Sequence, residues 1–402
     1  MKQGIDQKRI DELFARGTVT DVFPSKDALV KKLLAGEKIR IYYGLDPTHT
    51  AIHLGHAKNM IFLEELRQLG HEVIILFGDF TAQIGDPSDK SATRKSLTKE
   101  EVGRNMADWV RQISPIIDFK DKTNPATIRH NSEWLAKLSF ADILSLCSNF
   151  TVQQMIERDM FQKRLKDGSP IHVHEFMYPL MQGYDSVAMD VDAELCGTDQ
   201  IFNALAGRTL MKKLKDKEKF VIALNLIANP VTGQLMSKSN GTGVFIDQSA
   251  NELFGSLMAL PDPMLEPLFM NCTRIPLSEK ETIMAQGPRK AKALIAKDII
   301  TRFHGEKAAT SAEQAFEATF AKGGIPDDVL EIALAGQKLV GTTLVEALIK
   351  AGVVPSKTEW RRLVTDGAVR TEKDERITDP AFVPSETVVL KIGKRRFVKV
   401  VM

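Results

Sequence analysis

Residues 38–47, KIRIYYGLDP, alternate in polarity, are rich in β-branched and aromatic side chains and break at Pro47. This pattern predicts a strand that runs into a loop. Apolar residues then recur at roughly helical spacing until Gly70, and residues 72–80, EVIILFGDF, form a nearly continuous apolar run. Such a run is typical of a strand buried on both faces. Strand, helix and strand within about 45 residues predict a βαβ unit of a parallel sheet, with a ligand beyond the carboxyl ends of the strands.

The pattern changes twice along the rest of the chain. A second α/β stretch continues to about residue 225, whereas Ala-, Leu- and Lys-rich helical patterns occupy about 247–325. The last residues predict two short helices and a hairpin that turns at Gly393. We therefore expect an α/β, Rossmann-like parallel-sheet domain, then an all-α domain and a small α+β domain. The expected boundaries are 1–225 with a mostly helical insertion near 120–170, 226–325, a linker at 326–340, and 341–402.

Composition narrows the class of protein. A hydrophobic fraction of 43% and a charged fraction of 26% are those of ordinary globular proteins, which argues against a disordered chain. The three cysteines are far apart, so the sequence predicts neither a disulfide framework nor a zinc site. The start has no leader-like pattern, and no segment approaches the ~18 apolar residues of a membrane span. We therefore expect a cytoplasmic protein.

Positive charge is concentrated at the C-terminal end. The net charge of the chain is only +2, but residues 341–402 carry 12 Lys or Arg against 8 Asp or Glu, a net of +4. This basic end is compatible with RNA binding and, taken alone, equally with a solvated strand edge.

A first chemical motif is the segment HLGH, from His53 to His56, where the predicted loop enters its helix. Imidazoles beside the N–H groups of a helix N-terminus suit nucleotide phosphates, and Gly55 permits close approach of a ligand. Thr48 is a candidate hydroxyl donor to the same phosphates. In isolation, two structural histidines and a turn-forming Thr48 are the better explanation. The position between strand and helix favours the nucleotide site.

A second motif, MSKSNG, places Lys238 in a loop of small polar residues and glycines. Such a lysine can move onto phosphates as a mobile cation, although alone it is equally a turn with an exposed lysine. HLGH followed about 180 residues later by MSKS resembles the signature pair of class I aminoacyl-tRNA synthetases.

Three further segments offer polar ligands. Asp86, in GDPS, follows the second predicted strand, where a carboxylate can meet a ligand ammonium, although Asp-Pro is also a common turn. Tyr178, Gln182 and Asp185 share one helix face by i+4 and i+3 spacing. They would be costly to bury without partners, and a solvent-facing stripe is the alternative. The segment GTDQ at 197–200 again enters a predicted helix.

In the order YYGLDPT, HLGH, GDPS, YPLMQGYD, GTDQ and MSKS, these segments resemble the bacterial tyrosyl-tRNA synthetase family over nearly the whole chain. The resemblance implies activation of tyrosine by ATP to tyrosyl-adenylate, then transfer to the 3′-terminal ribose of tRNA(Tyr). It implies Mg²⁺ that accompanies ATP, no tightly bound cofactor, no protein metal site and a homodimer formed through about 120–170. The helical domain would be of the anticodon-binding type, and 341–402 resembles an S4-type RNA-binding domain.

The resemblance also assigns roles. Tyr42 and Asp185 match positions that hold the phenol hydroxyl of the substrate, and Asp86, Tyr178 and Gln182 match those that hold its ammonium. The positions near ATP are His53, His56, Thr48, Asp46 and Gly55, with Asp199 at the ribose, Gln200 near the reacting carboxylate and α-phosphate, and Lys90, Arg94 and Lys238 as mobile cations for pyrophosphate.

Two positions depart from the family pattern. Leu235 stands where the second motif usually begins with a lysine, so one cation is missing and pyrophosphate stabilisation would depend on the others. Tyr43 stands where many members have a smaller residue at the ribose, which puts that contact in doubt.

Two other functions remain open at this point. A small-molecule nucleotidyltransferase can also carry HxGH, but the MSKS loop and the basic end disfavour it. A non-catalytic RNA-binding paralogue is disfavoured because the catalytic and substrate-binding positions are intact, namely His53, His56, Asp86 and Asp185.

Overall fold

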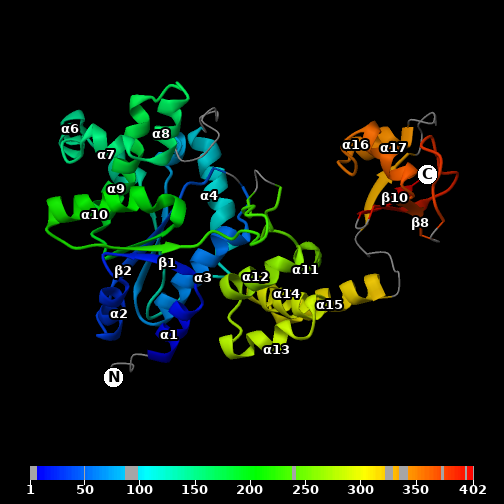
Figure 1. Ribbon diagram of the computed structural model, residues 1–402, viewed down its shortest axis with the longest axis horizontal. Coiled ribbons are helices and arrows are strands. Elements are labelled where there is room, and N and C mark those ends of the chain that lie inside the picture. Colours follow the sequence, from blue (N-terminus) through cyan, green and yellow to red (C-terminus); the bar gives the residue numbers. More distant parts are fainter. Residues whose placement is uncertain are drawn as a thin grey trace. The chain divides into compact units, whose positions relative to one another are not determined.

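The protein forms two compact units, Met1–Thr310 and Ser311–Met402, which are described separately (Figure 1). The computed structural model describes residues 7–48, 50–86, 98–237, 241–321, 329–334, 343–372, 375–393 and 396–401. Within these ranges, no helix is both long and apolar enough to cross a lipid bilayer.

A six-stranded sheet with the order β1-β6-β5-β2-β3-β4 forms the centre of the first unit. All neighbouring strands are parallel except the edge strand β1, which is antiparallel to β6. Every residue of β5 and β6 is buried, as a parallel sheet covered on both faces requires. The strands are β1 (Val19–Phe23), β2 (Arg40–Leu45), β3 (Glu72–Phe77), β4 (Thr127–His130), β5 (Ala193–Gly197) and β6 (Phe220–Leu224).

The predicted βαβ unit is confirmed as β2, α3 (Leu54–Gln68) and β3. Helix α3 begins at the N-cap His53, and Gly70 follows its end with a left-handed φ of 97°. Strand β2 pairs with β3 on one side and with β5 on the other, so the order of strands reverses there. Ligands of open parallel sheets bind beyond the carboxyl ends of the strands at such a point.

Helices cover the sheet. Three of them, α4, α9 and α10, carry residues of the candidate active site described below. Helices α9 and α10 pack closely against each other. The helices and 3₁₀ turns of this part are α1 (Gln7–Ala15), α2 (Lys26–Leu34), η1 (Thr81–Gln83), α4 (Lys99–Ile113), α5 (Ser132–Leu135), α6 (Phe140–Cys147), α7 (Val152–Ile156), α8 (Asp159–Lys166), η2 (Val173–Phe176), α9 (Met177–Met189), η3 (Thr198–Gln200) and α10 (Ile201–Lys215).

The segment 120–170, predicted as mostly helical, also contains the strand β4. This strand is only four residues long and none of its residues is buried, so it lacks the apolar run that marks β3. Its pairing with β3 makes it the edge of the sheet.

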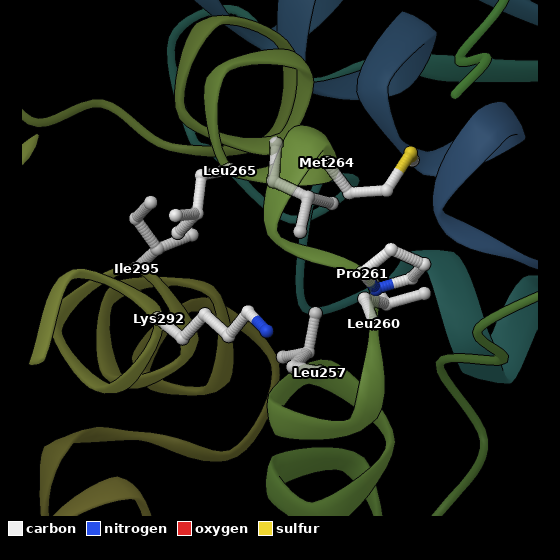
Figure 2. Close-up of a pocket in the computed structure, with 8 residues that line it drawn as sticks. Leu257, Leu260, Pro261, Met264, Leu265, Lys292 and Ile295 are labelled. Atoms are coloured by element: carbon white, nitrogen blue, oxygen red, sulfur yellow. The ribbon is translucent and has the colours of Figure 1, made fainter. Parts of the chain in front are cut away.

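The described residues from 250 to 321 are helices, turns and loops without a strand, as predicted. Apolar side chains of α11, of the loop after it and of α12 face α14 and line a narrow pocket (Figure 2). The Lys292 side chain extends from α14 toward Leu257, and its ammonium pairs with Asp262 at 2.6 Å. The elements are α11 (Ala250–Ala259), η4 (Asp262–Met264), α12 (Leu265–Cys272), η5 (Leu277–Glu279), α13 (Lys280–Met284), α14 (Pro288–His304) and α15 (Glu306–Ala321).

The second unit contains a four-stranded sheet with the order β7-β10-β9-β8, around a core that includes the buried Trp360. The predicted pair of helices and the hairpin with Gly393 are confirmed. A strand also forms within the segment predicted as a linker: β7 pairs in parallel with β10. The elements are β7 (Leu330–Ala333), α16 (Thr343–Lys350), α17 (Lys357–Thr365), β8 (Val369–Thr371), β9 (Val388–Ile392) and β10 (Arg396–Val401).

Candidate active site

Asp46 follows the carboxyl end of β2 and lies in a partly buried hydrogen-bonded cluster. The Tyr178 hydroxyl donates to its Oδ2 and the Thr81 hydroxyl to its Oδ1, both at 2.8 Å. Gly78 makes this approach possible, because a Cβ at that position would collide with the Asp46 carboxylate. Burial raises the pKa of Asp46 to about 7, although both donors oppose the shift. The carboxyl group therefore titrates near neutral pH.

Asp185 lies on the same side of α9 as Tyr178, which agrees with the predicted helical spacing. Its side chain is buried, and each carboxylate oxygen accepts one hydrogen bond. Trp134 Nε1 donates at 2.7 Å and Asn131 Nδ2 at 3.4 Å. Burial raises the pKa of Asp185, and the two N–H donors oppose that shift.

Tyr42 lies on β2 and is fully buried. Its hydroxyl lies 3.0 Å from Ser186 Oγ on α9, and Gln182, from the same helix, donates to Glu194 on β5 at 2.8 Å. The fully buried Lys219 pairs with Glu194. Two of the predicted tyrosine-binding residues are thus connected to one buried ion pair.

Asp86 and Gln200 meet at the carboxyl ends of β3 and β5. Gln200 Nε2 donates to Asp86 Oδ2 at 2.6 Å, and Asn203 Nδ2 donates to Gln200 Oε1 at 2.8 Å. Asp199 is exposed beside them, and a Cβ on Gly197 would lie only 2.4 Å from its carboxylate, so glycine leaves room for this side chain. The predicted entry of GTDQ into a helix is confirmed.

The HLGH segment caps α3. The Gly55 N–H donates to His53 Nδ1 at 3.1 Å, and the rings of His53 and His56 lie 4.1 Å apart between centroids. A Cβ on Gly55 would lie 2.7 Å from the His53 ring, so this conformation requires glycine. The two imidazoles therefore lie together at the helix N-terminus, as the sequence predicts.

The segment that follows the MSKS motif pairs with this cap. The Leu54 N–H donates to Val244 O at 2.9 Å, and the Ile246 N–H donates to Ile52 O at 3.0 Å. The Met236 carbonyl oxygen lies 3.8 Å from the position of a Cβ on Gly55. The two motifs are therefore neighbours in space.

The three predicted mobile cations, Lys90, Arg94 and Lys238, lie outside the described residues. The departure Leu235 stands at the start of the MSKS loop and is partly exposed. The second departure, Tyr43, is buried on β2.

Helix α4 holds the loop between β2 and α3. Asn105 Nδ2 donates to Pro47 O at 2.8 Å, and Gln112 bonds both the Thr50 carbonyl and the Ile52 N–H at 2.7 and 2.9 Å. The Thr48 N–H donates to Asp46 O at 2.7 Å, which bends the loop after the strand.

Several of these positions were not predicted from the sequence. Glu194 could have been recognised from the sequence as a candidate site residue, because it is the one charged residue in the otherwise apolar strand AELCG. Lys219 could not have been recognised in this way, since it stands among other charged residues before β6. The unpredicted positions are Gly78, Thr81, Asn105, Gln112, Asn131, Trp134, Ser186, Glu194, Asn203 and Lys219. Within the described ranges, no group of three or more His, Cys, Asp or Glu side chains could hold a metal ion.

Comparison with known proteins places this site in a family. The family model described as tRNA synthetases class I (W and Y) matches residues 34–321. The tyrosine–tRNA ligase of Carboxydothermus hydrogenoformans is 43% identical over 98% of both chains, and that of Haemophilus influenzae is 42% identical over 95% of this chain and 94% of its own.

A solved structure shares the fold. The C-terminally truncated mitochondrial tyrosyl-tRNA synthetase of Aspergillus nidulans superposes with a TM-score of 0.65 at 22% identity, over 78% of this chain and 94% of its own. The parallel sheet, the paired HLGH and MSKS segments and the near full-length relatives agree, and the chain belongs to the class I tRNA synthetase family of tryptophanyl and tyrosyl enzymes.

Proposed function

We propose that this protein is a tyrosine–tRNA ligase that joins tyrosine to ATP and passes the tyrosyl group to tRNA(Tyr). Relatives that carry this name match it over nearly their whole length at about 40% identity. The observation that carries the substrate assignment is the pair of buried polar side chains Tyr42, on β2, and Asp185, on α9. The hydroxyl of Tyr42 and the carboxylate of Asp185 can both bond a phenol.

The other end of the amino acid is assigned to the groups at the strand ends. Tyr178, Gln182 and Asp86 would hold its ammonium. Asp46, which the resemblance places near ATP, accepts a hydrogen bond from Tyr178, and we assign its carboxylate to the ammonium as well. Gln200 bonds Asp86 and would lie near the reacting carboxylate. A cation beside these oxygens satisfies carboxylates that are otherwise costly to bury.

ATP is assigned to the N-terminus of α3. His53, His56 and Thr48 would act on the phosphates, where the helix dipole and backbone N–H groups already favour negative charge. Gly55 lets the nucleotide approach the backbone, and Asp199 would bond the ribose. Mg²⁺ would arrive with the phosphates, in agreement with the chemistry of that ion.

The reaction needs no side-chain nucleophile. The tyrosine carboxylate attacks the α-phosphorus of ATP, the bond to the pyrophosphate oxygen breaks, and pyrophosphate leaves. Rate acceleration then comes from positioning and from donors and cations aimed at the charge that develops. Lys90, Arg94 and Lys238 are proposed as the cations that reach the leaving pyrophosphate.

The tRNA is assigned to the basic C-terminal unit and the helical part. Residues 341–402 have a net charge of +4, and electrostatic attraction to phosphates is the main source of affinity for RNA. We propose the cytoplasm as the location, because all three cysteines are free, as in a reducing compartment.

We also propose a homodimer formed through the helices within 120–170. Phe140 at the start of α6 is 74% exposed and Val152 at the start of α7 is 68% exposed. Beside them, an apolar cavity of about 430 Å³ lies among η1, α6 and α9, with Ile143 and Leu146 in its lining. Exposed apolar area of this kind favours association.

The test is ATP–pyrophosphate exchange with each of the twenty amino acids, followed by charging of purified tRNA(Tyr). We expect exchange with tyrosine and transfer to the tRNA. Exchange that ignores the amino acid would indicate a nucleotidyltransferase. RNA binding without adenylate formation would indicate a non-catalytic paralogue. Either result would overturn the assignment.

A further inference from the structure

A cluster of buried polar side chains behind Tyr42 takes no part in the proposed reaction. Tyr42 on β2 is in register with Glu194 on β5, and Glu194 is in register with Val221 on β6. Paired residues of parallel strands point to the same face, and so does Lys219, two residues before Val221. Tyr42, Glu194 and Lys219 therefore lie side by side on one face of the sheet.

Lys219 is fully buried, and its ammonium has three oxygen neighbours. It donates to Ser186 Oγ at 2.8 Å and to Ala204 O at 3.1 Å, and it forms an ion pair with Glu194. An ammonium group has three N–H donors and no acceptor, so all three donors are used. Ser186 Oγ is therefore an acceptor in its contact with Lys219.

Helices α9 and α10 leave room for the Lys219 ammonium. A Cβ on Gly207 of α10 would lie 2.5 Å from Lys219 Nζ and 2.9 Å from Ser186 Oγ. A Cβ on Gly183 of α9 would lie 3.0 Å from the Gly207 backbone nitrogen. Glycine at both positions lets α9 and α10 approach each other directly over Lys219, so the packing of the helices is adapted to a lysine at this point.

The proton of Ser186 determines the direction of the next hydrogen bond. Ser186 is fully buried, and among the residues that the structure describes its only polar side-chain neighbours are Lys219 and Tyr42. A buried hydroxyl proton without an acceptor is costly, and an ammonium cannot accept one. Ser186 therefore donates to Tyr42 Oη at 3.0 Å.

The proton of Tyr42 is then directed away from Ser186. Burial, the negative charges of Glu194 and Asp185 and a hydrogen-bonding contact with the Glu194 side chain raise the pKa of Tyr42 well above its usual range, so the phenol keeps its proton at neutral pH. Glu194 competes weakly for this proton, because its two carboxylate oxygens already accept from Gln182 and Lys219. Tyr42 thus remains a hydrogen-bond donor in the pocket.

We propose that Lys219, Glu194 and Ser186 are positioning residues that make Tyr42 donate its hydrogen bond to the phenol oxygen of the substrate. The substrate phenol then donates its own proton to Asp185. The proposal rests on the assigned tyrosine site and specifies the direction of each hydrogen bond within it: Lys219 to Ser186, Ser186 to Tyr42, Tyr42 to substrate, and substrate to Asp185.

The same ion pair also orients a second side chain of the pocket. Glu194 accepts from Gln182 Nε2 at one carboxylate oxygen and pairs with Lys219 through the other. Lys219 thus orients Tyr42 through Ser186 and orients Gln182 through Glu194.

The test compares tyrosine with 4-aminophenylalanine in ATP–pyrophosphate exchange. The aromatic amine of this analogue donates hydrogen bonds readily but accepts poorly, since its lone pair is delocalised into the ring. A fixed donor at Tyr42 therefore discriminates against it. Ser186→Ala removes the bond that directs the Tyr42 proton, so Tyr42 can turn and accept from the amine.

We expect the ratio of kcat/KM for tyrosine over 4-aminophenylalanine to fall about five- to tenfold in Ser186→Ala, the effect of one neutral hydrogen bond. Lys219→Met alone would leave Glu194 buried without its partner, so the double variant Lys219→Met, Glu194→Gln serves for the ion pair. It should show the same fall.

Lys217→Met is the matched control, because this partly exposed lysine pairs with Asp190 and Asp192 outside the pocket. Its ratio should equal that of the wild type. Equal losses for both amino acids in Ser186→Ala and in the double variant, with the ratio unchanged, would show a merely structural role and overturn the proposal. Absence of tyrosine-dependent exchange in the wild type would instead overturn the assigned function itself.

Discussion

In the proposed amino-acid site, Tyr42 and Asp185 would meet the substrate phenol with different chemistry. Asp185 is held by Trp134 and Asn131, so its carboxylate can accept a hydrogen bond from the hydroxyl of a bound phenol. Bound phenylalanine would offer no acceptor to the Tyr42 hydroxyl proton and no donor to Asp185 in a buried site, which costs more than the loss of a single contact. Under the proposed assignment, selection against phenylalanine would therefore come from unsatisfied groups and not from pocket size.

Removing either group should narrow the preference for tyrosine. Tyr42→Phe should weaken tyrosine binding by about 1 kcal/mol. Asp185→Asn should cost more, because it replaces the acceptor that Trp134 and Asn131 hold in place for the phenol with an amide. The measurement is the ratio of kcat/KM for tyrosine and phenylalanine in pyrophosphate exchange. Tyr184→Phe is the control, since Tyr184 packs with the apolar cluster of α9 and α10. If both pocket variants keep the wild-type ratio, the hydroxyl is recognised elsewhere.

Asp46 should make tyrosine binding depend on pH. With a pKa of about 7, its carboxyl group is mostly neutral at pH 6 and mostly ionised at pH 8. Only the ionised form attracts the ammonium beside Tyr178, so affinity should rise with pH in this window, by at most about tenfold per pH unit. Calorimetric titration at pH 6, 7 and 8 measures it. Asp46→Asn should flatten the profile, and parallel profiles in both proteins would contradict this role.

At the scale of elements, the close contact of α9 and α10 depends on residues without side chains. Gly183 lies against Gly207 there, and the space between the helices and the sheet is occupied by Lys219. In the same way α4 carries Asn105 and Gln112 to the loop after β2, so that the proposed nucleotide and amino-acid sides of the site would be held by separate helices.

Gly207→Ala should destabilise the protein by about 1–3 kcal/mol, because the added methyl meets Lys219 Nζ and Ser186 Oγ in a close-packed region. The midpoint of urea unfolding measures the loss. Gly255→Ala in α11 is the matched control, since a Cβ there meets nothing within 4 Å. Alanine in a helix interior should stabilise that variant by about 0.5–1 kcal/mol. Similar midpoints for both variants would show that α9 and α10 can separate without cost.

At the scale of the whole molecule, the functions are divided between units. The proposed activation site lies entirely within Met1–Thr310, whereas the basic segment 341–402 belongs to the other unit. Each unit has its own core, and that of the second unit surrounds Trp360 and Leu390. Amino-acid activation should therefore not require the second unit.

Removal of residues 341–402 should greatly weaken tRNA charging and leave tyrosine-dependent pyrophosphate exchange near the wild-type rate. Because the full chain would bind tRNA mainly through phosphates, its affinity should fall steeply with salt concentration. Charging assays measure the first effect. Measurements of tRNA binding at 50 and 200 mM salt measure the second, and six or more phosphate contacts predict a loss of affinity of about 10³-fold or more. Unchanged charging by the shortened protein would contradict the assignment of tRNA to this unit.

The sequence by itself determined the βαβ unit, the helical part and the terminal hairpin. Each of these follows from a local sequence pattern. The patterns are an apolar run for β3, helical spacing up to Gly70, and a glycine turn at Gly393. The motif positions at strand ends and on one face of α9 follow from the same local rules. The edge strands β4 and β7 escaped prediction, because four residues carry too little pattern.

Only the tertiary structure decided which polar groups meet. Tyr42 and Glu194 are far apart in the chain, and they become neighbours because β2 pairs with β5 in one particular register. Lys219 reads as one more charged residue before a strand, yet it is fully buried because the next strand places it beneath two glycines. Strand pairing and helix packing join residues that are far apart in the chain. A local stretch of sequence therefore cannot predict them.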